Sequence, residues 1–252
     1  MYLDRDGVKI YYEVNGTGPA TILLTHGYSG TLRMWDPQIE ALAEHYQLVT
    51  WDLRGHGKSD SPEDVAQYSS DRAITDMCAL LDAVNAPQAV IGGLSLGGYL
   101  SLAFHTLHAE RTTALVLADT GPGYRNDVAR EDWNKMARAR GKFFRRKGLA
   151  GLPEGDPAHG DTHTSADGLA KAAEGTLVQH DGNVMASLPG IKVPTLVMVG
   201  ADDSAFIKPS QYMAGKIPGA RLEIIPGAGH VANIDQAQLF NDALVGFLAT
   251  LA

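Results

Sequence analysis

The chain has 252 residues, of which 44% are hydrophobic and 20% are charged, a composition typical of globular proteins. This length can bury one sizeable core, so we expect a single domain with room for an insertion. The net charge of -8 argues against a nucleic-acid partner, because phosphate binding requires clustered Lys and Arg side chains. The single cysteine, Cys78, has no partner for an internal disulfide.

Residues 1–16 carry no recognisable targeting signal. They contain neither an apolar secretory core nor an Arg-rich amphipathic pattern. No window of the sequence approaches the roughly 18 uninterrupted apolar residues of a membrane-spanning helix. We therefore expect a cytoplasmic protein that has no membrane partner.

Short apolar runs rich in β-branched residues recur along the chain between helical patterns. This alternation is typical of the α/β class, in which helices cover both faces of a parallel sheet. The first such region, Val8–Val14, alternates between polar and apolar residues and predicts an antiparallel hairpin at the sheet edge. The later predicted strands are Thr21–Thr25, Gln47–Trp51, Ala89–Gly92, Ala114–Ala118, Thr195–Val199 and Arg221–Ile225.

Three helices are predicted between and after these strands. Ser70 is a candidate N-cap for the first, in which apolar residues recur at a spacing of three and four. Cys78 falls on the apolar face of this helix, and we interpret it as a small core residue. The second helix is predicted from Leu96 to about His108, and the last from Gln236 to the C-terminus.

Residues 122–190 interrupt the alternation of strands and helices. A helical pattern around Trp133 and Phe144 is followed by a loop-like stretch and then by a second helical pattern. We interpret this segment as a helical lid inserted into a core formed by residues 1–121 and 191–252. Because ligands bind at the carboxyl ends of parallel strands, the lid would cover that edge of the sheet.

The first part of this segment is basic. The stretch Arg125–Lys147 holds nine Lys or Arg against three acidic residues in a chain that is acidic as a whole. We interpret it as a solvated helix face. The alternative is a lid that attracts an anionic substrate, such as a lactone that bears a carboxylate.

The segment Gly93–Gly97 reads Gly-Leu-Ser-Leu-Gly and connects an apolar strand to an apolar helix. In this context the G-x-S-x-G pattern forms a nucleophile elbow, a strained turn that lifts the serine hydroxyl above the sheet. The turn requires small residues two positions before and after the serine, which Gly93 and Gly97 provide. The helix that follows directs its N–H groups toward developing negative charge. These features predict Ser95 as a catalytic nucleophile.

A serine hydroxyl needs a base to remove its proton as it attacks. His230 is the best candidate, because a glycine-rich loop after the last predicted strand can bring its imidazole over the sheet. The base in turn needs a carboxylate that holds its tautomer. We prefer Asp203, which follows the fifth of the later strands, with its neighbour Asp202 second and Asp119 third.

The order serine, aspartate, histidine is the one that elbow-type hydrolases use. On this order and the elbow, nearly the whole chain resembles the serine-nucleophile branch of the α/β-hydrolase family. The resemblance implies an eight-stranded, mostly parallel sheet with helices on both faces and a helical lid. Residues 26–28, which read His-Gly-Tyr, also match the family. The match implies that the N–H groups of Tyr28 and Leu96 form an oxyanion hole, which binds the substrate. It implies a supporting role for His26.

A further family-like segment, residues 52–59, reads Asp-Leu-Arg-Gly-His-Gly-Lys-Ser. In similar proteins this stretch braces the loops around the site, which implies structural roles for Arg54 and His56. His56 is therefore not the predicted base.

Two lid histidines, His159 and His163, lie close to Asp161 in the loop-like stretch. Together they could suggest a metal site, but the segment lacks a fourth well-spaced ligand. We expect no metal there and no cofactor, because the implied mechanism needs neither.

The resemblance implies a hydrolase that cleaves a small carboxylic ester or lactone through the Ser95, Asp203 and His230 triad and an acyl-enzyme. It is strongest to enol-lactonases, small esterases and cofactor-free haloperoxidases. Three alternatives use the same residues: a carbon–carbon bond hydrolase, a cofactor-free perhydrolase, and a hydrolase-like receptor that signals to a partner protein. The serine in the elbow argues against dehalogenases and epoxide hydrolases, whose nucleophile is a carboxylate.

Overall fold

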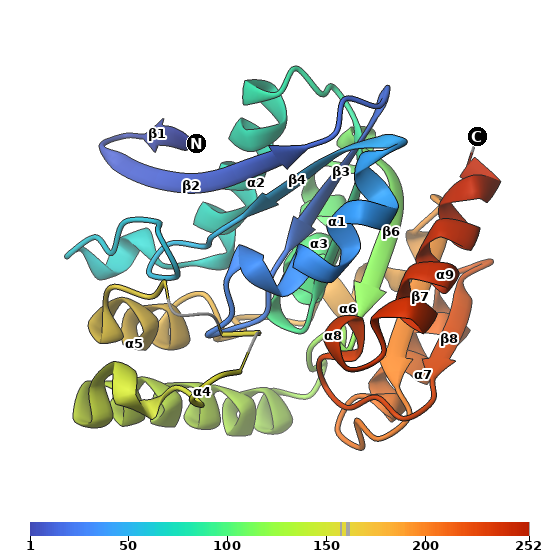
Figure 1. The fold of residues 1–252 in the computed structure, drawn as a ribbon. Coiled ribbons are helices and arrows are strands. Elements are labelled where there is room, and N and C mark those ends of the chain that lie inside the picture. Colours follow the sequence, from blue (N-terminus) through green and yellow to red (C-terminus); the bar gives the residue numbers. More distant parts are fainter. Residues whose placement is uncertain (157, 160–161, 252) are drawn as a thin grey trace.

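The computed structural model describes residues 1–156, 158–159 and 162–251, which form an eight-stranded sheet covered by helices (Figure 1). The strand order is β1-β2-β4-β3-β5-β6-β7-β8. β2 pairs antiparallel with β1 and β4, and every later pair is parallel. The predicted α/β class is confirmed. The strands are β1 (Tyr2–Arg5), β2 (Val8–Asn15), β3 (Ala20–Thr25), β4 (Tyr46–Trp51), β5 (Ala89–Leu94), β6 (Thr112–Ala118), β7 (Thr195–Gly200) and β8 (Arg221–Ile225).

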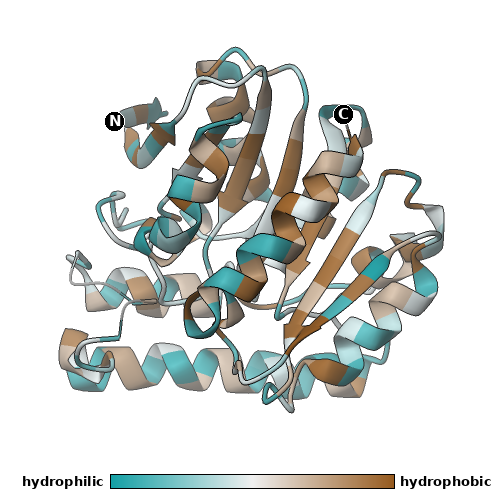
Figure 2. Ribbon diagram, turned by 45° about the vertical axis from the view of Figure 1, so that its right-hand side comes forward, coloured by the Kyte–Doolittle hydropathy of each residue, from teal (hydrophilic) through white to brown (hydrophobic). Residues whose placement is uncertain are grey.

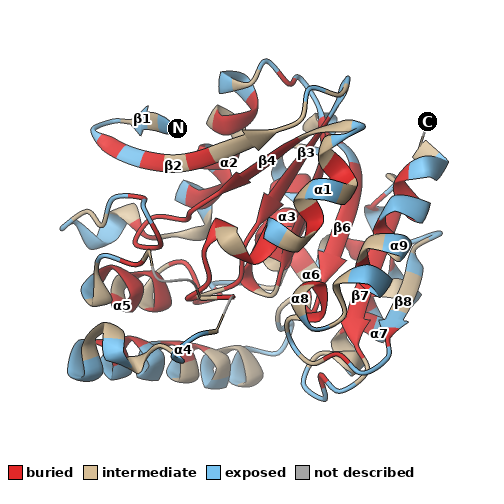
Figure 3. Ribbon diagram, viewed as in Figure 1, coloured by how far each residue is buried: buried red, intermediate tan, exposed pale blue. Residues whose placement is uncertain are grey.

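Every predicted strand is present, and the N-terminal hairpin consists of β1 and β2. The central strands read as unbroken apolar runs because both of their faces are covered, and β5 and β7 are buried along their whole length. Figures 2 and 3 show this as a hydrophobic, buried centre beneath helices whose outer faces are hydrophilic and exposed. β5 continues two residues beyond the predicted end, so it carries the chain directly into the elbow.

Helices pack against two separate apolar clusters, one on each face of the sheet. α2, α3 and α7 contribute to one cluster, and α1 and α9 contribute to the other. The helices in the described residues are α1 (Asp36–Ala43), α2 (Ser70–Ala83), α3 (Leu96–Leu107), α4 (Asp127–Lys147), α5 (Ala166–Glu174), α6 (Asn183–Ser187), α7 (Ile207–Lys216), α8 (Ala232–Asp235) and α9 (Ala237–Leu248).

The predicted cap of α2 was wrong by one residue. Ser69 is the N-cap, since its extended backbone and its side-chain oxygen, which accepts from the N–H of Arg72, meet the requirements of that position. Ser70 is the first helical residue. Cys78 is half-buried and packs against the core cluster, as its place in the apolar pattern predicted.

In its described residues, the predicted lid segment 122–190 contains the long helix α4 and the shorter helices α5 and α6. α4 and α5 pack against each other and lie together beyond the carboxyl ends of the central strands (Figure 1). The short helix α6 packs against α3, and its Val184 belongs to the main apolar cluster. The division of the chain into a core and a lid stays a prediction.

No helix in the described part of the chain is long and apolar enough to cross a membrane.

Candidate active site

The turn between β5 and α3 holds Ser95 in an unusual backbone conformation. Its φ is 55° and its ψ is -115°, a region that residues with side chains rarely adopt. The Ser95 N–H donates to the carbonyl of Ala118 at 2.9 Å, which anchors the turn to the neighbouring strand. A strained residue at the end of a buried strand is typical of a functional site.

Close packing explains why glycine flanks Ser95 at both positions of the pattern. A methyl group on Gly97 would lie 2.0 Å from the carbonyl oxygen of Thr25, at the end of β3. One on Gly93 would lie 2.4 Å from the carbonyl carbon of Gly97. Both distances are far below van der Waals contact, so the turn forms only because neither residue has a side chain.

The structure brings the three predicted triad residues together. His230 Nε2 lies 3.0 Å from Ser95 Oγ, and His230 Nδ1 lies 2.7 Å from Asp203 Oδ2. Because the carboxylate can only accept, Nδ1 carries the proton and Nε2 faces the hydroxyl as a base. The Asp203 side chain is 6% exposed and that of His230 is 44% exposed. Phe206 stacks on the imidazole with ring centroids 4.9 Å apart.

The two other candidate acids lie elsewhere. Asp202 is exposed, and its backbone N–H donates to the carbonyl of Ala228. Asp119 is fully buried after β6, and its Oδ1 accepts from the N–H of Gly200 at 2.8 Å. Burial raises the pKa of Asp119 to about 7, and the nearby Asp203 carboxylate adds to the effect. Of the three, only Asp203 hydrogen-bonds to His230.

The predicted oxyanion-hole residues flank Ser95. A methyl group on Gly27 would lie 3.4 Å from Ser95 Cβ, so the residues after β3 pass directly beside the nucleophile. Tyr28 follows Gly27, and Leu96 is the first residue of α3. Among the described residues, neither Tyr28 N–H nor Leu96 N–H has a hydrogen-bond acceptor. Both donors therefore remain available to a ligand oxygen.

The Tyr28 side chain contacts the helices of residues 122–190. Its hydroxyl donates to the carbonyl of Leu169 in α5 at 2.9 Å. Its ring lies edge-on to Phe144 of α4 and to His56. Burial raises the pKa of the Tyr28 hydroxyl, so it stays a neutral donor. Sequence reasoning assigned Tyr28 only a backbone role and missed this contact.

Residues 52–59 brace the turn beside Ser95, as the resemblance implied. Asp52 Oδ1 accepts from the N–H of Leu32 and Oδ2 from the N–H of Lys58, both at 2.8 Å. Burial raises the pKa of Asp52 to about 6, although both of these bonds favour the charged form. One carboxylate thus links the residues after β3 to those after β4.

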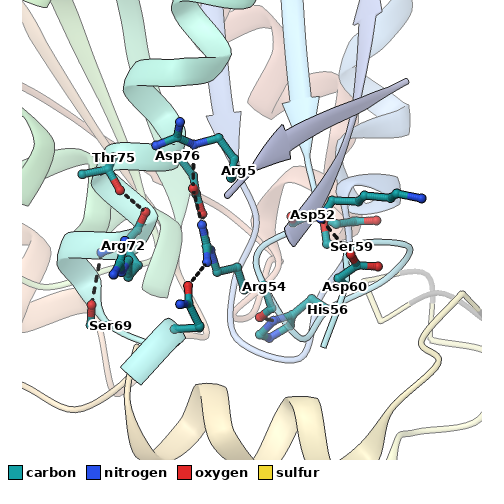
Figure 4. Close-up of polar contacts among 12 residues, drawn as sticks. Arg5, Asp52, Arg54, His56, Ser59, Asp60, Ser69, Arg72, Thr75 and Asp76 are labelled. Carbon is teal, nitrogen blue, oxygen red and sulfur yellow. Dashed lines mark hydrogen bonds and ion pairs between the residues drawn. The ribbon is translucent and has the colours of Figure 1, made fainter. Parts of the chain in front are cut away.

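Figure 4 shows the other anchor of residues 52–59. Arg54 bonds both carboxylate oxygens of buried Asp76 in α2, at 2.6 and 2.8 Å. Arg5 and Gln67 complete the cluster around the pair. Bidentate geometry and burial make this a rigid attachment of the segment to the core.

Two buried histidines bond to backbone through both ring nitrogens. His26 Nε2 accepts from the N–H of Leu53 at 3.0 Å, and His56 Nε2 accepts from the N–H of Ser29 at 3.1 Å. The Nδ1–H of each donates to a carbonyl close to it in sequence. Burial lowers the pKa of His26 to about 3 and that of His56 well below its ordinary value. Both are neutral supports, in agreement with the prediction.

The segment considered for metal binding has a different arrangement. Asp161 lies outside the described residues, and His159 pairs with Asp156. His163 instead bonds two backbone groups, the N–H of Gly57 and the carbonyl of Ser29. The described residues contain no cluster of three or more His, Cys, Asp or Glu side chains that could hold a metal.

The basic helix α4 spreads its charges over an exposed face. Four of its cations pair with acidic side chains: Arg130 with Asp127, Lys135 with Asp132, Arg138 with Glu131, and Arg145 with Asp167 and Glu174. The remaining cations of the stretch have no acidic partner among the described residues; these are Arg125, Arg140, Lys142, Arg146 and Lys147. Exposure and partial pairing support the solvated-face interpretation.

Comparisons with known proteins agree with this architecture. A family model described as "Alpha/beta hydrolase family" matches residues 22–243. The 3-oxoadipate enol-lactonase 2 of Acinetobacter baylyi is 30% identical, over 96% of this chain and 94% of its own. A Bacillus subtilis protein provisionally named as a 2-succinyl-6-hydroxy-2,4-cyclohexadiene-1-carboxylate synthase is 28% identical, over 98% and 97%. The crystal structure of the enol-lactonase from Burkholderia xenovorans LB400 has a TM-score of 0.81 at 28% identity, and the match covers 99% of this chain and 100% of that one.

Proposed function

Because the chain belongs to the α/β-hydrolase family, we propose that it cleaves a small carboxylic ester or lactone through Ser95, His230 and Asp203. One observation carries this proposal: hydrogen bonds run unbroken from Asp203 through the His230 ring to the Ser95 hydroxyl. This arrangement supplies the base that a serine needs before it can attack a carbonyl carbon. The names of the two enol-lactonases support a lactone or ester as the substrate class.

In the first half of the proposed reaction, Ser95 Oγ attacks the carbonyl carbon while His230 Nε2 takes its proton. Asp203 stabilises the imidazolium that forms. The N–H groups of Tyr28 and Leu96 hold the tetrahedral oxyanion, and the dipole of α3 adds to their effect. Collapse of this intermediate breaks the ester bond, and His230 passes its proton to the leaving alcohol.

In the second half, a water molecule releases the acid from Ser95. His230, now neutral again, takes a proton from this water as it attacks the acyl carbonyl, and a second tetrahedral oxyanion forms in the same site. The partial exposure of the His230 side chain leaves a route for water from solvent. Collapse returns the proton to Ser95 Oγ and frees the carboxylic acid.

The test is hydrolysis of a panel of nitrophenyl esters and simple lactones by the wild type, Ser95→Ala and His230→Ala. We expect turnover by the wild type and a loss of about 10⁵-fold or more in kcat for Ser95→Ala, as for other serine hydrolases. Wild-type activity that survives in Ser95→Ala would refute the proposal. A matched control is Ser204→Ala, because Ser204 is an exposed serine near Asp203 that lies outside the proposed relay.

The same panel separates the alternatives. Cleavage of ring-cleavage diketones with no ester turnover would indicate a carbon–carbon bond hydrolase. Halogenation with peroxide and a carboxylic acid, lost in Ser95→Ala, would indicate a perhydrolase. Labelling of Ser95 by a fluorophosphonate without multiple turnover of any substrate would favour a receptor role.

A further inference from the structure

The turn that carries the proposed oxyanion donor Tyr28 contacts the segment between α4 and β7 at three points. The Tyr28 hydroxyl donates to the carbonyl of Leu169 at 2.9 Å. The N–H of Thr31 donates to the carbonyl of Ala158 at 3.3 Å. His163 Nε2 lies 2.9 Å from the carbonyl oxygen of Ser29. Residues far apart in sequence thus hold one short turn.

Ser29 occupies the strained position of this turn. The N–H of Gly30 donates to the carbonyl of Gly27 at 3.0 Å, which closes a β-turn with Ser29 as its third residue. The φ of Ser29 is 59°, a conformation that favours glycine at this place in a turn. A residue with a side chain keeps such a conformation only where its surroundings hold it.

Two histidines hold Ser29 from opposite sides of its backbone. His56 Nε2 accepts from its N–H at 3.1 Å, and His163 donates to its carbonyl. Residues 52–59 supply His56, and the segment between α4 and α5 supplies His163. The peptide groups on both sides of Ser29 are therefore fixed by partners that do not belong to the turn.

His163 links the turn to residues 52–59 as well. Its Nδ1 accepts from the N–H of Gly57 at 3.0 Å, so its proton is on Nε2 and faces Ser29. The residue is 8% exposed, and its ring lies 5.9 Å from that of His56. Both nitrogens have backbone partners in one tautomer, as in the supports His26 and His56.

We infer that His163 is a positioning residue for the turn at residues 27–31, here called the oxyanion turn, because its bond to the Ser29 carbonyl holds the strained backbone that follows the Tyr28 N–H. This inference rests on the proposed function. The Tyr28 N–H lies one residue before Ser29, so rotation of the peptide groups of Ser29 would displace it. A displaced donor weakens stabilisation of the transition state more than binding of the ground state.

The effect of His163→Ala on ester hydrolysis is the first test. We expect kcat to fall between about 10-fold and 100-fold, less than the loss for a deleted oxyanion donor, and KM to change less than about threefold. The rate of Ser95 labelling by a fluorophosphonate should fall in parallel, because the phosphoryl oxygen occupies the same hole. This second readout does not depend on the natural substrate.

Two conservative variants separate the two bonds of His163. The amide nitrogen of Gln in His163→Gln can take the place of Nε2 and donate to Ser29, whereas His163→Asn keeps an acceptor near Nδ1 for Gly57. We expect His163→Gln to recover most of the kcat and His163→Asn to behave like His163→Ala. Equal recovery of kcat by both variants would overturn the inference, because activity would then not depend on the hydrogen bond to Ser29.

The matched control is Asn134→Ala, which also lies within residues 122–190. Asn134 in α4 also makes two side-chain bonds to backbone, both with Gln179, and is 9% exposed. It does not bond the oxyanion turn. We expect Asn134→Ala to lower the melting temperature at least as much as His163→Ala does and to change kcat less than about threefold.

The outcomes distinguish this inference from the proposed function. The role of His163 would be overturned if His163→Ala kept the wild-type kcat and labelling rate, or if Asn134→Ala lost as much kcat as His163→Ala does. The proposed function would still stand in either case, provided that Ser95→Ala is inactive. Activity that survives in Ser95→Ala, or a wild type that neither turns over esters nor labels at Ser95, would overturn both.

Discussion

The two sides of the candidate active site are built by different means. The side that carries Ser95, Asp203 and His230 consists of strand ends and the loops directly after them, and close contacts between backbone atoms set its geometry. The other side, the turn at residues 27–31 after β3, has its strained residue Ser29 held by side chains from two distant segments. The packing of the sheet fixes the geometry of the first side, whereas a few side-chain hydrogen bonds fix that of the second.

This difference predicts how each side fails. A strand end cannot shift without disturbing the core, so changes there cost stability as well as activity. A turn held by side-chain bonds can relax locally, so the loss of one bond lowers activity while the fold persists. Four substitutions probe this contrast, in order of decreasing size of effect.

Of these four, Asp203→Asn should have the largest effect. The amide keeps the shape of the carboxylate but favours the wrong His230 tautomer, so we expect kcat to fall by about 10⁴-fold with little change in KM. Steady-state ester hydrolysis measures this. Asp202→Asn is the control and should keep wild-type activity; a larger loss there would show that the assignment of the acid is wrong.

Next in size is Gly97→Ala, which tests the rigid side. Its new methyl group would meet the Thr25 carbonyl oxygen at 2.0 Å, so strand β3 or the elbow must move. We expect a loss of roughly 2–4 kcal/mol in the free energy of unfolding together with the loss of activity, measured by denaturant titration.

Gly215→Ala is the matched control for the glycine experiment. Gly215 lies in α7, where an added methyl group meets no atom within 4 Å. The change should stabilise the protein by up to about 1 kcal/mol. If Gly97→Ala were as harmless as this control, steric contact would not explain the elbow glycines.

A smaller, pH-dependent effect is expected from Asp119→Asn. Burial raises the pKa of Asp119 to about 7 from its ordinary value of 3.8, so the folded chain holds a proton that the unfolded chain releases. The protonated Asp119 carboxyl therefore contributes to the stability of the folded chain. This contribution is complete below about pH 4 and is lost as the pH rises through about 7. Asparagine does not titrate.

The measurement is the melting temperature of Asp119→Asn relative to the wild type across this pH range. The melting temperature of the variant should rise steadily relative to that of the wild type as the pH rises from about 4 to about 8. If the melting temperature of the variant instead fell relative to that of the wild type over this range, the Asp119 carboxyl would be ionised in the folded protein.

The smallest effect is expected on the exposed face of α4. Arg146→Glu should change the free energy of unfolding by less than about 0.5 kcal/mol, because the side chain is exposed and has no acidic partner among the described residues. The ratio of kcat/KM for a carboxylate-bearing ester to that for a neutral ester should stay unchanged. A ratio that falls several-fold at low salt would favour the alternative, an anion-attracting lid.

The same contrast explains how much the sequence could predict. The strands, the elbow and the order of the triad depend on local patterns and on chain order. The candidates Ser95, His230 and Asp203, which the structure brings within hydrogen-bond distance, could therefore be proposed without coordinates. The α2 cap was missed by one residue because Ser69 and Ser70 are adjacent and both suit the position.

The contacts of His163 could not be predicted, because its partners Ser29 and Gly57 lie more than 100 residues away in sequence and contribute only backbone groups. A backbone partner leaves no residue-type signal for a pattern to detect. Phe206 was missed for a related reason: its stacking on His230 follows from the path of the loop after β7 and not from a motif.

The stacking of Phe206 on His230 also gives the site a spectroscopic signature. With the ring centroids 4.9 Å apart and the planes inclined by 28°, the aromatic ring current shields the imidazole protons. Their NMR resonances should therefore shift upfield. Phe206→Leu would identify the signal of the proposed base His230 by removing the shift, and magnetic resonance could then follow its protonation directly.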